Sequence, residues 1–339
     1  MSNNAPIQGL GWLTTGGTPR DIGVALGRMG RAAVCQHLLA HPLWQTVNSE
    51  ELASSVAAMA DRVRVRFPAI WEEILGLAEG LEVPVKEVFA WNCRGDLLAS
   101  VPDGCTTVMV PRAEPLIAHN EDGFPFFKGA CFIAEIRPVG APTFHAFCYP
   151  GSLPGHTFAF NSAGLVQTVN NMRLTGVKAT MPRMVLGRAI LSARTIAAAL
   201  DVLENAPSGG FHFALMHQAD GRIVSVEFGG GSCSIKEITE PAAHANHALH
   251  LERGLSAQII TDSSRDRQAR ATELLRSTPD PLEILRDVGG RGLPIRRDEA
   301  DDSDEENTLG TAVLQLTRQG LCWSIHDRID GPARFTSAA

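Results

Sequence analysis

The Gly104-Cys105 step is the place where the residue types of this chain could do chemistry most directly. The thiol opens the apolar, β-branched run Thr106–Val110, which predicts a strand and places Cys105 at a sheet edge, within reach of a substrate. Gly104 has no Cβ, so the peptide bond between the two residues can adopt geometries that are closed to other residues. This arrangement suits self-cleavage: the Cys105 thiol attacks the Gly104 carbonyl, and hydrolysis of the thioester leaves Cys105 as a new N-terminus.

An N-terminal cysteine would carry both a nucleophile and its base. Its α-amine has a reference pKa of about 7.7–8.0, and such an amine can activate a neighbouring nucleophile. The alternative is a buried cysteine at the start of a strand, which is common among free cysteines. The Gly-Cys-Thr sequence alone does not decide between the two, so the other polar residues have to be weighed.

A polar cluster, His119-Asn120-Glu121-Asp122, closes the second strand expected after the cysteine. Adjacent antiparallel strands would bring this cluster beside the Cys105 thiol. A carboxylate there could accept a hydrogen bond from the Cys105 ammonium and hold it in place. The alternative is a solvated turn at the end of the strand.

Amide and guanidinium side chains on later segments could complete such a site. Asn170-Asn171 ends a strand and Asn246 lies in a loop, and amide side chains can donate to the oxyanion of a tetrahedral intermediate. The run from Ser264 to Arg270 opens a helix with arginines, which are unfavourable for the helix dipole at that end. This indicates another task for the arginines, such as fixing a carboxylate, and a basic surface turn is the alternative.

The overall composition excludes several classes of function. The chain has 339 residues, 44% of them hydrophobic, and a net charge of −7 without a basic tract, which argues against a nucleic-acid partner. The N-terminal residues lack a basic stretch followed by an apolar one, and no apolar run is long enough to span a bilayer. We therefore expect a soluble, cytoplasmic protein without a membrane partner.

The cysteines and histidines give no clear metal motif. The seven cysteines are scattered and form no C-x-x-C pair, which argues against a disulfide framework and a zinc cluster. His244, His247 and His250 have three-residue spacing that could suggest a metal, but their segment reads as an irregular loop with no carboxylate close by in sequence. We predict neither a metal nor another cofactor.

The order of the predicted elements indicates the architecture. Residues 1–102 read as mostly helical, and short strands follow Cys105 in groups that are separated by helices. The acidic segment 298–307 reads as a solvated loop. Strands and helices in this order fit two stacked sheets flanked by helices. Helices are expected at 21–39, 68–80, 86–98, 184–204, 264–277 and 281–288.

Several motifs follow one another along the chain: Asp103-Gly104-Cys105-Thr106-Thr107, His119-Asn120-Glu121-Asp122, Phe160-Asn161-Ser162-Ala163-Gly164-Leu165, His244-Ala245-Asn246-His247 and Ser264-x-x-Arg267-x-x-Arg270. This ordered set resembles the acyl-CoA:6-aminopenicillanate acyltransferase family, a group of N-terminal-nucleophile hydrolases that is more distantly similar to penicillin V and bile salt hydrolases. Residues 74–80 and 91–94 resemble the helical pro-segment of that family, so the resemblance covers nearly the whole chain.

The resemblance implies an α+β fold of four layers, αββα, and maturation by cleavage before Cys105. Residues 1–104 would form a helical pro-segment that is retained after cleavage. Residues 105–339 would form the catalytic chain, which begins at the nucleophile. The two together would make one globular domain.

The resemblance also implies roles for single residues. Cys105 would be the nucleophile, Asp122 the carboxylate near it and Asn246 the oxyanion donor. Arg267 matches the active-site arginine of the family, and Arg265 stays open as an alternative.

We predict a self-processed thiol amidohydrolase or acyltransferase that takes a small N-acyl amide through a thioester. N-acyl amino acids, penicillin-like amides and β-alanyl amides all stay open as substrates, because Glu121 stands where relatives often carry an aromatic residue. Nothing in the sequence marks a coenzyme A site, so hydrolysis is the default outcome. The candidates for substrate binding are Asn120, Glu121, Asn170 and Asn171.

Other functions remain as alternatives. An unprocessed Cys–His hydrolase could use His119 or His156, and a binding protein without catalytic activity could share the fold. A serine hydrolase is disfavoured, because Ser152 in Gly151-Ser152-Leu153-Pro154-Gly155 stands in the wrong place for G-x-S-x-G. The sequence leaves the oligomeric state open, a homo-oligomer included.

Overall fold

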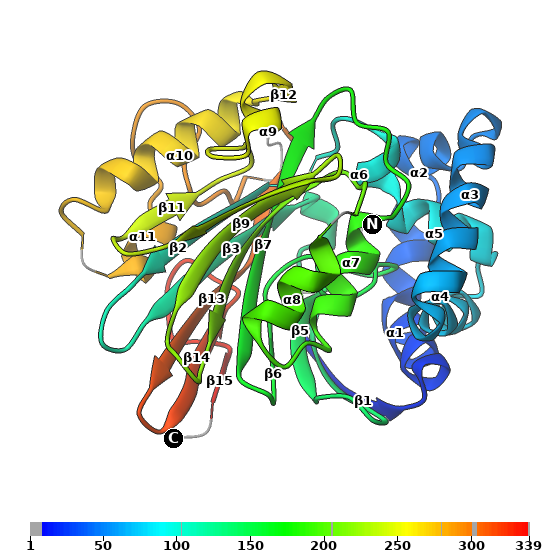
Figure 1. The fold of residues 1–339 in the computed structure, drawn as a ribbon, viewed down its shortest axis with the longest axis horizontal. Coiled ribbons are helices and arrows are strands. Elements are labelled where there is room, and N and C mark those ends of the chain that lie inside the picture. Colours follow the sequence, from blue (N-terminus) through cyan, green and yellow to red (C-terminus); the bar gives the residue numbers. More distant parts are fainter. Residues whose placement is uncertain (1–8, 103, 205, 279, 300–303, 338–339) are drawn as a thin grey trace, which may run out of the picture.

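Two β-sheets pack face to face and are covered on their outer faces by helices (Figure 1). The computed structural model describes residues 9–102, 104–204, 206–278, 280–299 and 304–337. Asp103, which precedes the Gly104-Cys105 pair, and part of the predicted acidic loop lie outside these residues. The predicted αββα layering is confirmed.

The larger sheet contains nine strands among the described residues. β1 runs parallel to β4 over seven paired positions, and the other neighbouring strands of this sheet pair in the antiparallel sense. In spatial order the strands are β1 (Gly11–Gly17), β4 (Phe132–Pro138), β5 (Phe144–Cys148), β6 (Ala159–Asn161), β7 (Leu165–Leu174), β8 (Gly210–His217), β9 (Ile223–Gly229) and β10 (Ser232–Glu237), with β12 (Gln258–Ile259) added to β7.

The smaller sheet contains six antiparallel strands among the described residues, and it carries the cysteine. Its strand β2 packs against β7 of the larger sheet. In spatial order the strands are β11 (Ala242–His244), β2 (Gly104–Val110), β3 (Leu116–Gly123), β13 (Asn307–Thr317), β14 (Gly320–His326) and β15 (Phe335–Thr336).

The helices form the two outer layers. Those over the larger sheet and on its side are α1 (Pro19–Ala33) with a π-helical continuation at Val34–Leu38, α2 (Pro42–Val47), α3 (Glu50–Arg66), α4 (Pro68–Leu81), α5 (Val85–Asn92), α6 (Arg94–Leu97), α7 (Arg183–Ile190) and α8 (Ile196–Leu203). Those over the smaller sheet are α10 (Asp262–Leu274) and α11 (Pro281–Leu285). Two short helices, the 3₁₀ turn Pro125–Phe127 and α9 (Glu252–Ser256), lie in connections.

Glycines allow the two long N-terminal helices to touch. A Cβ added to Gly23 of α1 would lie 2.0 Å from the Glu73 carbonyl oxygen, and one added to Gly76 of α4 would lie 2.2 Å from the Arg20 carbonyl oxygen. Only residues without a Cβ permit this close approach of two backbones. The contact makes α1 and α4 a closely packed pair in the helical layer on the side of the larger sheet.

The structure corrects two of the predicted elements. Gly11–Gly17, where the sequence pattern predicted no clear strand, forms β1 at one end of the larger sheet. The single helix expected at 184–204 is two helices, because Thr195 begins α8 by accepting a hydrogen bond from the Ala198 N–H at 3.1 Å. The strands expected between Cys105 and Ile238 are confirmed, with shifts of a few residues at their ends.

Candidate active site

Cys105 lies at the start of β2 and is buried, with 1% of its surface exposed. The antiparallel register pairs Cys105 with Glu121 and Gly104 with Asp122. The predicted proximity of the thiol and the polar cluster on β3 is therefore observed. Alternation along the strand points Cys105 and Thr107 to the same side, and the Thr107 hydroxyl contacts β7 through Thr168. The thiol thus faces the space between the two sheets.

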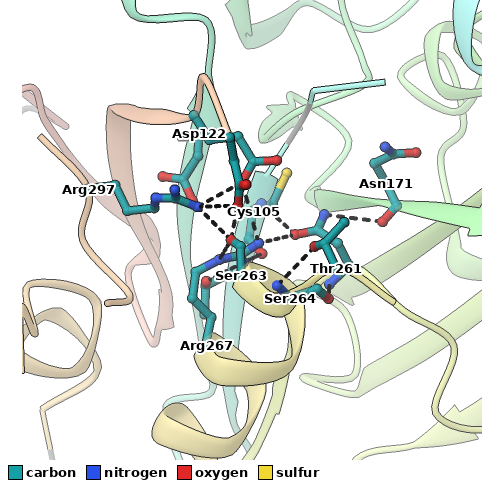
Figure 2. A network of polar contacts seen from close by, with 12 residues as sticks. Cys105, Asp122, Asn171, Thr261, Ser263, Ser264, Arg267 and Arg297 are labelled. Atoms are coloured by element: carbon teal, nitrogen blue, oxygen red, sulfur yellow. Dashed lines mark hydrogen bonds and ion pairs between the residues drawn. The ribbon is translucent and has the colours of Figure 1, made fainter. Parts of the chain in front are cut away.

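Asn246 and Arg267 meet at the backbone of Cys105 (Figure 2). The Cys105 N–H donates to Asn246 Oδ1 at 2.9 Å. The Arg267 guanidinium donates to the same amide oxygen at 2.6 Å, and also to the carbonyl oxygen of Cys105. Arg265 instead pairs with Asp262 on the surface. The geometry therefore favours Arg267 over Arg265 as the arginine of the site.

The first turn of α10 holds this arrangement. Thr261 caps the helix by accepting from the Ser264 N–H, and the Ser264 hydroxyl accepts from the Asn246 N–H at 2.9 Å. The Ser263 hydroxyl accepts from Arg267 Nε at 3.0 Å. Sequence reasoning missed Ser263, although serines and threonines at a helix start are a known capping signal. The cap and the site share the same residues.

The predicted oxyanion donor is engaged elsewhere in the uncut chain. Asn246 Nδ2 donates to the backbone carbonyl of Asn171 at 3.1 Å. The side-chain amide of Asn171 is buried, and neither its nitrogen nor its oxygen has a hydrogen-bond partner among the described residues. The Asn246 amide therefore contacts the backbone of Asn171, and the side-chain amide of Asn171 is left without a partner among the described residues.

Asn120 and Asn170 are not brought to the thiol. Asn120 Nδ2 donates to the Leu285 carbonyl at 2.7 Å, so the side chain faces the helical layer over the smaller sheet. Asn170 Oδ1 accepts from the Thr107 hydroxyl at 2.8 Å, and Thr107 lies two residues after Cys105 on β2. Of the predicted substrate-binding residues, Glu121 contacts the thiol, and Asn171 contacts Asn246 through its backbone carbonyl.

Asp122 faces Gly104 and is incompletely paired. Its Oδ1 accepts from the Thr308 hydroxyl at 2.6 Å, whereas Oδ2 is buried without a hydrogen-bond partner among the described residues. Burial raises the pKa of the Asp122 carboxyl, although the charge of Arg267 and the Thr308 hydrogen bond act in the opposite direction. A cation formed beside Asp122 would stabilise its ionised form.

The end of the acidic segment is not solvated, contrary to our prediction. Glu306 is 2% exposed and pairs with Arg173 at 3.3 Å and with Arg297 at 3.2 Å. A Cβ added to Gly104 would lie 2.6 Å from Glu306 Oε2, so this carboxylate packs directly against the glycine of the candidate cleavage site. A charge run in the sequence gives no sign of which of its members is buried.

Glu121 forms a buried cluster with the thiol. Its Oε2 lies 3.6 Å from Cys105 Sγ and 3.1 Å from His119 Nε2, and its Oε1 accepts from the Tyr149 hydroxyl at 2.9 Å. Tyr149 is the single tyrosine of the chain. His156 lies elsewhere, with Nδ1 at 2.8 Å from the Leu153 carbonyl oxygen. The histidine nearest to the thiol is thus His119, and a carboxyl group stands between them.

Among the described residues, the pocket beside this cluster is too small for a substrate. A pocket next to Tyr149 has a volume of about 10 Å³, and its lining includes Trp91, Pro102 and Gly123. Ligand pockets are usually larger than about 300 Å³. Pro102 belongs to the segment that leads to Gly104, so movement of this segment would widen the pocket.

Comparison with known proteins places the chain in a family. The model of a family described as acyl-coenzyme A:6-aminopenicillanic acid acyl-transferase matches residues 110–328, which include Asp122, Asn246 and Arg267 and begin after Cys105. The chain belongs to this family.

Relatives match this member of the acyltransferase family along most of its length. The β-alanyl-dopamine/carcinine hydrolase of Drosophila melanogaster is 23% identical over 355 residues, which cover 91% of each chain. The acyl-coenzyme A:6-aminopenicillanic-acid-acyltransferase 40 kDa form of Emericella nidulans is 27% identical over 281 residues, which cover 78% of this chain and 76% of that protein.

A crystal structure of a variant of conjugated bile acid hydrolase from Clostridium perfringens matches 71% of this chain and 85% of that one, with 11% identity and a TM-score of 0.34. By family and relatives, this acyltransferase-family chain is an enzyme of the amide hydrolase and acyltransferase class. In the part of the chain that the structure describes, no helix has the length and apolar character needed to cross a membrane.

Two groups of side chains in this family member could be considered for a metal. The ligand atoms of Cys105, His119 and Glu121 lie within 4.8 Å of one another, a set that a divalent cation could share. The histidines that the sequence suggested are used differently. His244 pairs with Glu227 at 2.9 Å, and His250 contacts Ser225 and Ser234. The absence of a metal stays a prediction.

Proposed function

We propose that this enzyme cuts its own chain between Gly104 and Cys105 and then hydrolyses small N-acyl amides through a thioester on Cys105. The observation that carries the proposal is the contact of the Cys105 N–H with Asn246 Oδ1, which Arg267 fixes. The nitrogen that cleavage would turn into an α-amine thus already has a positioned acceptor. Residues 1–104 would stay bound to residues 105–339 as a second chain.

The surroundings of Cys105 suit an N-terminal ammonium. Asp122 faces Gly104 across the strand pair, and its Oδ2, which has no hydrogen-bond partner in the part of the chain that the structure describes, would accept from the new amine once the peptide bond is broken. Asn246 Oδ1 would accept another of its hydrogens and direct the remaining lone pair. The free amine can then remove the proton from the Cys105 thiol.

The reaction follows from these positions. The Cys105 thiolate attacks the carbonyl carbon of an N-acyl amide, and the α-amine passes the thiol proton to the leaving nitrogen. The C–N bond breaks, the amine product departs, and an acyl thioester remains on Cys105. Water then attacks the thioester, releasing the carboxylic acid and restoring the thiol. The amide group of Asn246 is the candidate oxyanion donor, and a donor of this kind contributes about 3 kcal/mol in such sites.

Water is the acyl acceptor we favour. The relative that matches along 91% of both chains is named a β-alanyl-dopamine/carcinine hydrolase. We therefore propose a small N-acyl amide as the substrate, with the segment before Gly104 moving aside to admit it. We also propose a cytoplasmic enzyme, an assignment that its seven free cysteines favour.

Two measurements test the proposal. Intact mass and terminal sequencing of purified protein should give chains 1–104 and 105–339 that co-purify under native conditions. A panel of N-acyl amino acids, penicillins and β-alanyl amides should show amide hydrolysis by this material, with release of the free amine. A fully active single chain would overturn the N-terminal-nucleophile mechanism.

A further inference from the structure

Self-cleavage needs a base other than the α-amine of Cys105, because this amine forms only when the chain is cut. In the uncut chain the nitrogen of Cys105 belongs to a peptide bond and donates its hydrogen to Asn246, so it cannot take up the thiol proton. We propose that Glu121, backed by His119, is the proton acceptor that activates Cys105 for cleavage of the Gly104–Cys105 bond. This inference rests on the proposed self-cleavage and assigns the step that precedes the mature enzyme.

The position of Glu121 fits that task. The strand register places it directly opposite Cys105, and its Oε2 is the carboxyl oxygen 3.6 Å from Sγ. Its other oxygen accepts from the Tyr149 hydroxyl at 2.9 Å, which fixes the carboxyl plane. Glu121 and His119 are both fully buried, so water does not compete for the proton.

The hydrogen bonds around His119 determine where its protons lie. Asn170 Nδ2 donates to the His244 carbonyl, so Asn170 Oδ1 is the acceptor, and it receives the hydroxyl hydrogen of Thr107. The Thr107 oxygen must therefore accept from His119 Nδ1, 2.8 Å away. His119 Nε2 then meets Glu121 Oε2 at 3.1 Å with one proton between them. The pair is a shared-proton couple with one side open to the thiol.

The step can be written with every proton assigned. The thiol proton moves to Glu121 Oε2 as the shared proton moves fully to His119 Nε2, and Sγ attacks the Gly104 carbonyl carbon. The couple then returns one proton to the Cys105 nitrogen as the C–N bond breaks, which leaves a thioester between Gly104 and Cys105 Sγ. Water hydrolyses the thioester to a Gly104 carboxylate and a free Cys105 thiol.

The electrostatic surroundings keep the couple at one shared proton. Burial, with a further contribution from Arg267, lowers the pKa of His119 to about 3, so His119 does not hold a second proton near neutral pH. Other polar and titratable groups face the couple from the elements packed against it. They are Cys105 on β2, Cys131 before β4, Tyr149 after β5, His212 on β8 and Arg267 on α10.

The role of Glu121 as a base ends once the chain is cut, so maturation and turnover can be compared to test it. Once the α-amine exists it serves as the base, so Glu121→Gln should slow maturation far more than turnover. The experiment follows the uncut chain on gels after cell-free synthesis of the full-length protein. General bases typically contribute about 10²–10⁴ in rate, so we expect cleavage at least about 100-fold slower. Turnover per active site, counted by iodoacetamide labelling of N-terminal Cys105, should fall by a clearly smaller factor than cleavage, because the α-amine then replaces Glu121 as the base.

Two further variants make the result specific. Glu73→Gln changes another buried carboxylate, which pairs with Arg188 at 2.8 Å beneath the larger sheet, and it should mature at the wild-type rate. Glu121→Asp keeps the acid and should restore part of the cleavage rate. The melting temperature of Glu121→Gln, compared with that of the uncut Cys105→Ala chain, shows whether Glu121→Gln folds. If it does not fold, the cleavage rate of Glu121→Asp tests the inference instead.

His119 acts through Glu121, so its test needs a pH profile. In His119→Gln no imidazole accepts the proton that Glu121 shares with Nε2, so this proton has to leave to solvent before Glu121 can take the thiol proton. Cleavage should then fall steeply from pH 8 to pH 5, where the wild-type rate stays flat. The double variant Glu121→Gln with His119→Gln should be no slower than Glu121→Gln alone, because the two act as one unit.

Several outcomes would overturn the inference. These are wild-type cleavage in Glu121→Gln, an equal loss of cleavage and of turnover per site, a pH-independent loss in His119→Gln, or additive losses in the double variant. None of them touches the proposed function, which would fail separately if the wild-type chain stayed whole.

Discussion

Two buried His–Glu pairs in this protein have the same composition and different surroundings. His244 Nε2 lies 2.9 Å from Glu227, and His119 Nε2 lies 3.1 Å from Glu121. Glu227 also accepts three backbone N–H bonds, from Leu249, His250 and Leu251. The contacts of Glu121 include the Tyr149 hydroxyl and the Cys105 thiol.

The difference shows how neighbours assign a role to a residue pair. Burial alone would raise the pKa of Glu227, but the His244 hydrogen bond and the backbone donors lower it to about 2, so this carboxylate is fixed in its charged form. Glu227 therefore anchors the loop that follows Asn246. A carboxyl that faces a thiol and an imidazole can exchange a proton instead. The following predictions test this contrast, from the largest expected effect to the smallest.

Removing the thiol removes the feature that sets the Glu121 pair apart. Cys105→Ala should give an uncut chain without detectable amide hydrolysis, because no nucleophile remains for either step. Cys105→Ser should be cut slowly or not at all, since a hydroxyl is a weaker nucleophile than a thiol. Mass spectrometry and an amine-release assay measure both effects. Hydrolysis by Cys105→Ala at the wild-type rate would show that the thiol is not the nucleophile.

Substitution of Asp122 and substitution of Glu121 should have different effects on turnover by the mature enzyme. Asp122→Asn removes the charge that would hold the Cys105 ammonium, and we expect turnover per active site to fall about 100-fold or more. Glu121→Gln should affect turnover less. If Glu121→Gln lowers turnover by the mature enzyme more than Asp122→Asn does, then Glu121, and not Asp122, is the carboxylate that holds the ammonium.

The same substitution should act differently on the uncut chain. Burial raises the pKa of Asp122 there, so its ionised form opposes folding at pH values above its ordinary range, and that cost disappears on acidification. Asp122→Asn in the Cys105→Ala background should therefore be at least as stable at pH 7 as Cys105→Ala alone. Urea unfolding at pH 7 measures the difference, and a clear loss of stability would contradict this picture.

Glu227 should behave as a structural carboxylate. Its pKa falls from an ordinary 4.5 to about 2 in the folded protein. The stability it contributes, about 3 kcal/mol from 1.36 kcal/mol per pKa unit, is present above pH 4.5 and lost as pH falls towards 2. Glu227→Gln should lower the free energy of unfolding by about this amount at pH 7. It should also make the free energy of unfolding less dependent on pH between pH 4.5 and pH 2. Urea titrations between pH 3 and pH 7 test both, and a slowed cleavage in the folded variant would erase the contrast with Glu121.

A buried cysteine away from both pairs serves as the reference. Cys148 is fully buried on β5, and burial raises the pKa of its thiol, so it should resist iodoacetamide in the folded protein. Cys148→Ala should cost about 1 kcal/mol through lost packing and leave cleavage unchanged. Thermal unfolding and the cleavage assay check the two expectations. Slower cleavage in Cys148→Ala would mean that the cleavage rate depends on core packing in general and not on Glu121 in particular.

Sequence patterns predicted most of the fold because its strands are short and separated by turn residues. β1 was missed because Gly11-Trp12-Leu13-Thr14-Thr15-Gly16-Gly17 contains three glycines, which weaken a strand signal, and its partner β4 lies far along the chain. The break between α7 and α8 was missed because the apolar residues continue on both sides of it. Long-range pairing and local caps decided these cases.

The candidate site was predicted in part. The motifs named Cys105, Asp122, Asn246 and Arg267, and the structure brings them together around the start of β2. Motifs carry no distances, so they could not show that Glu306 packs against Gly104 or that Tyr149 reaches Glu121. They also could not show that Asn120 faces away, since this depends on which side of β3 each residue occupies.

The parallel pairing of β1 with β4 has a consequence for refolding. Cleavage after Gly104 would place β1 and β4, which match at seven positions, on separate polypeptides. The uncut Cys105→Ala chain would then recover from denaturant in a unimolecular reaction, at a rate independent of dilution. The cut protein would need two chains to meet, so its recovery should slow as protein concentration falls. The reaction order of refolding would thus report whether the chain had been cut.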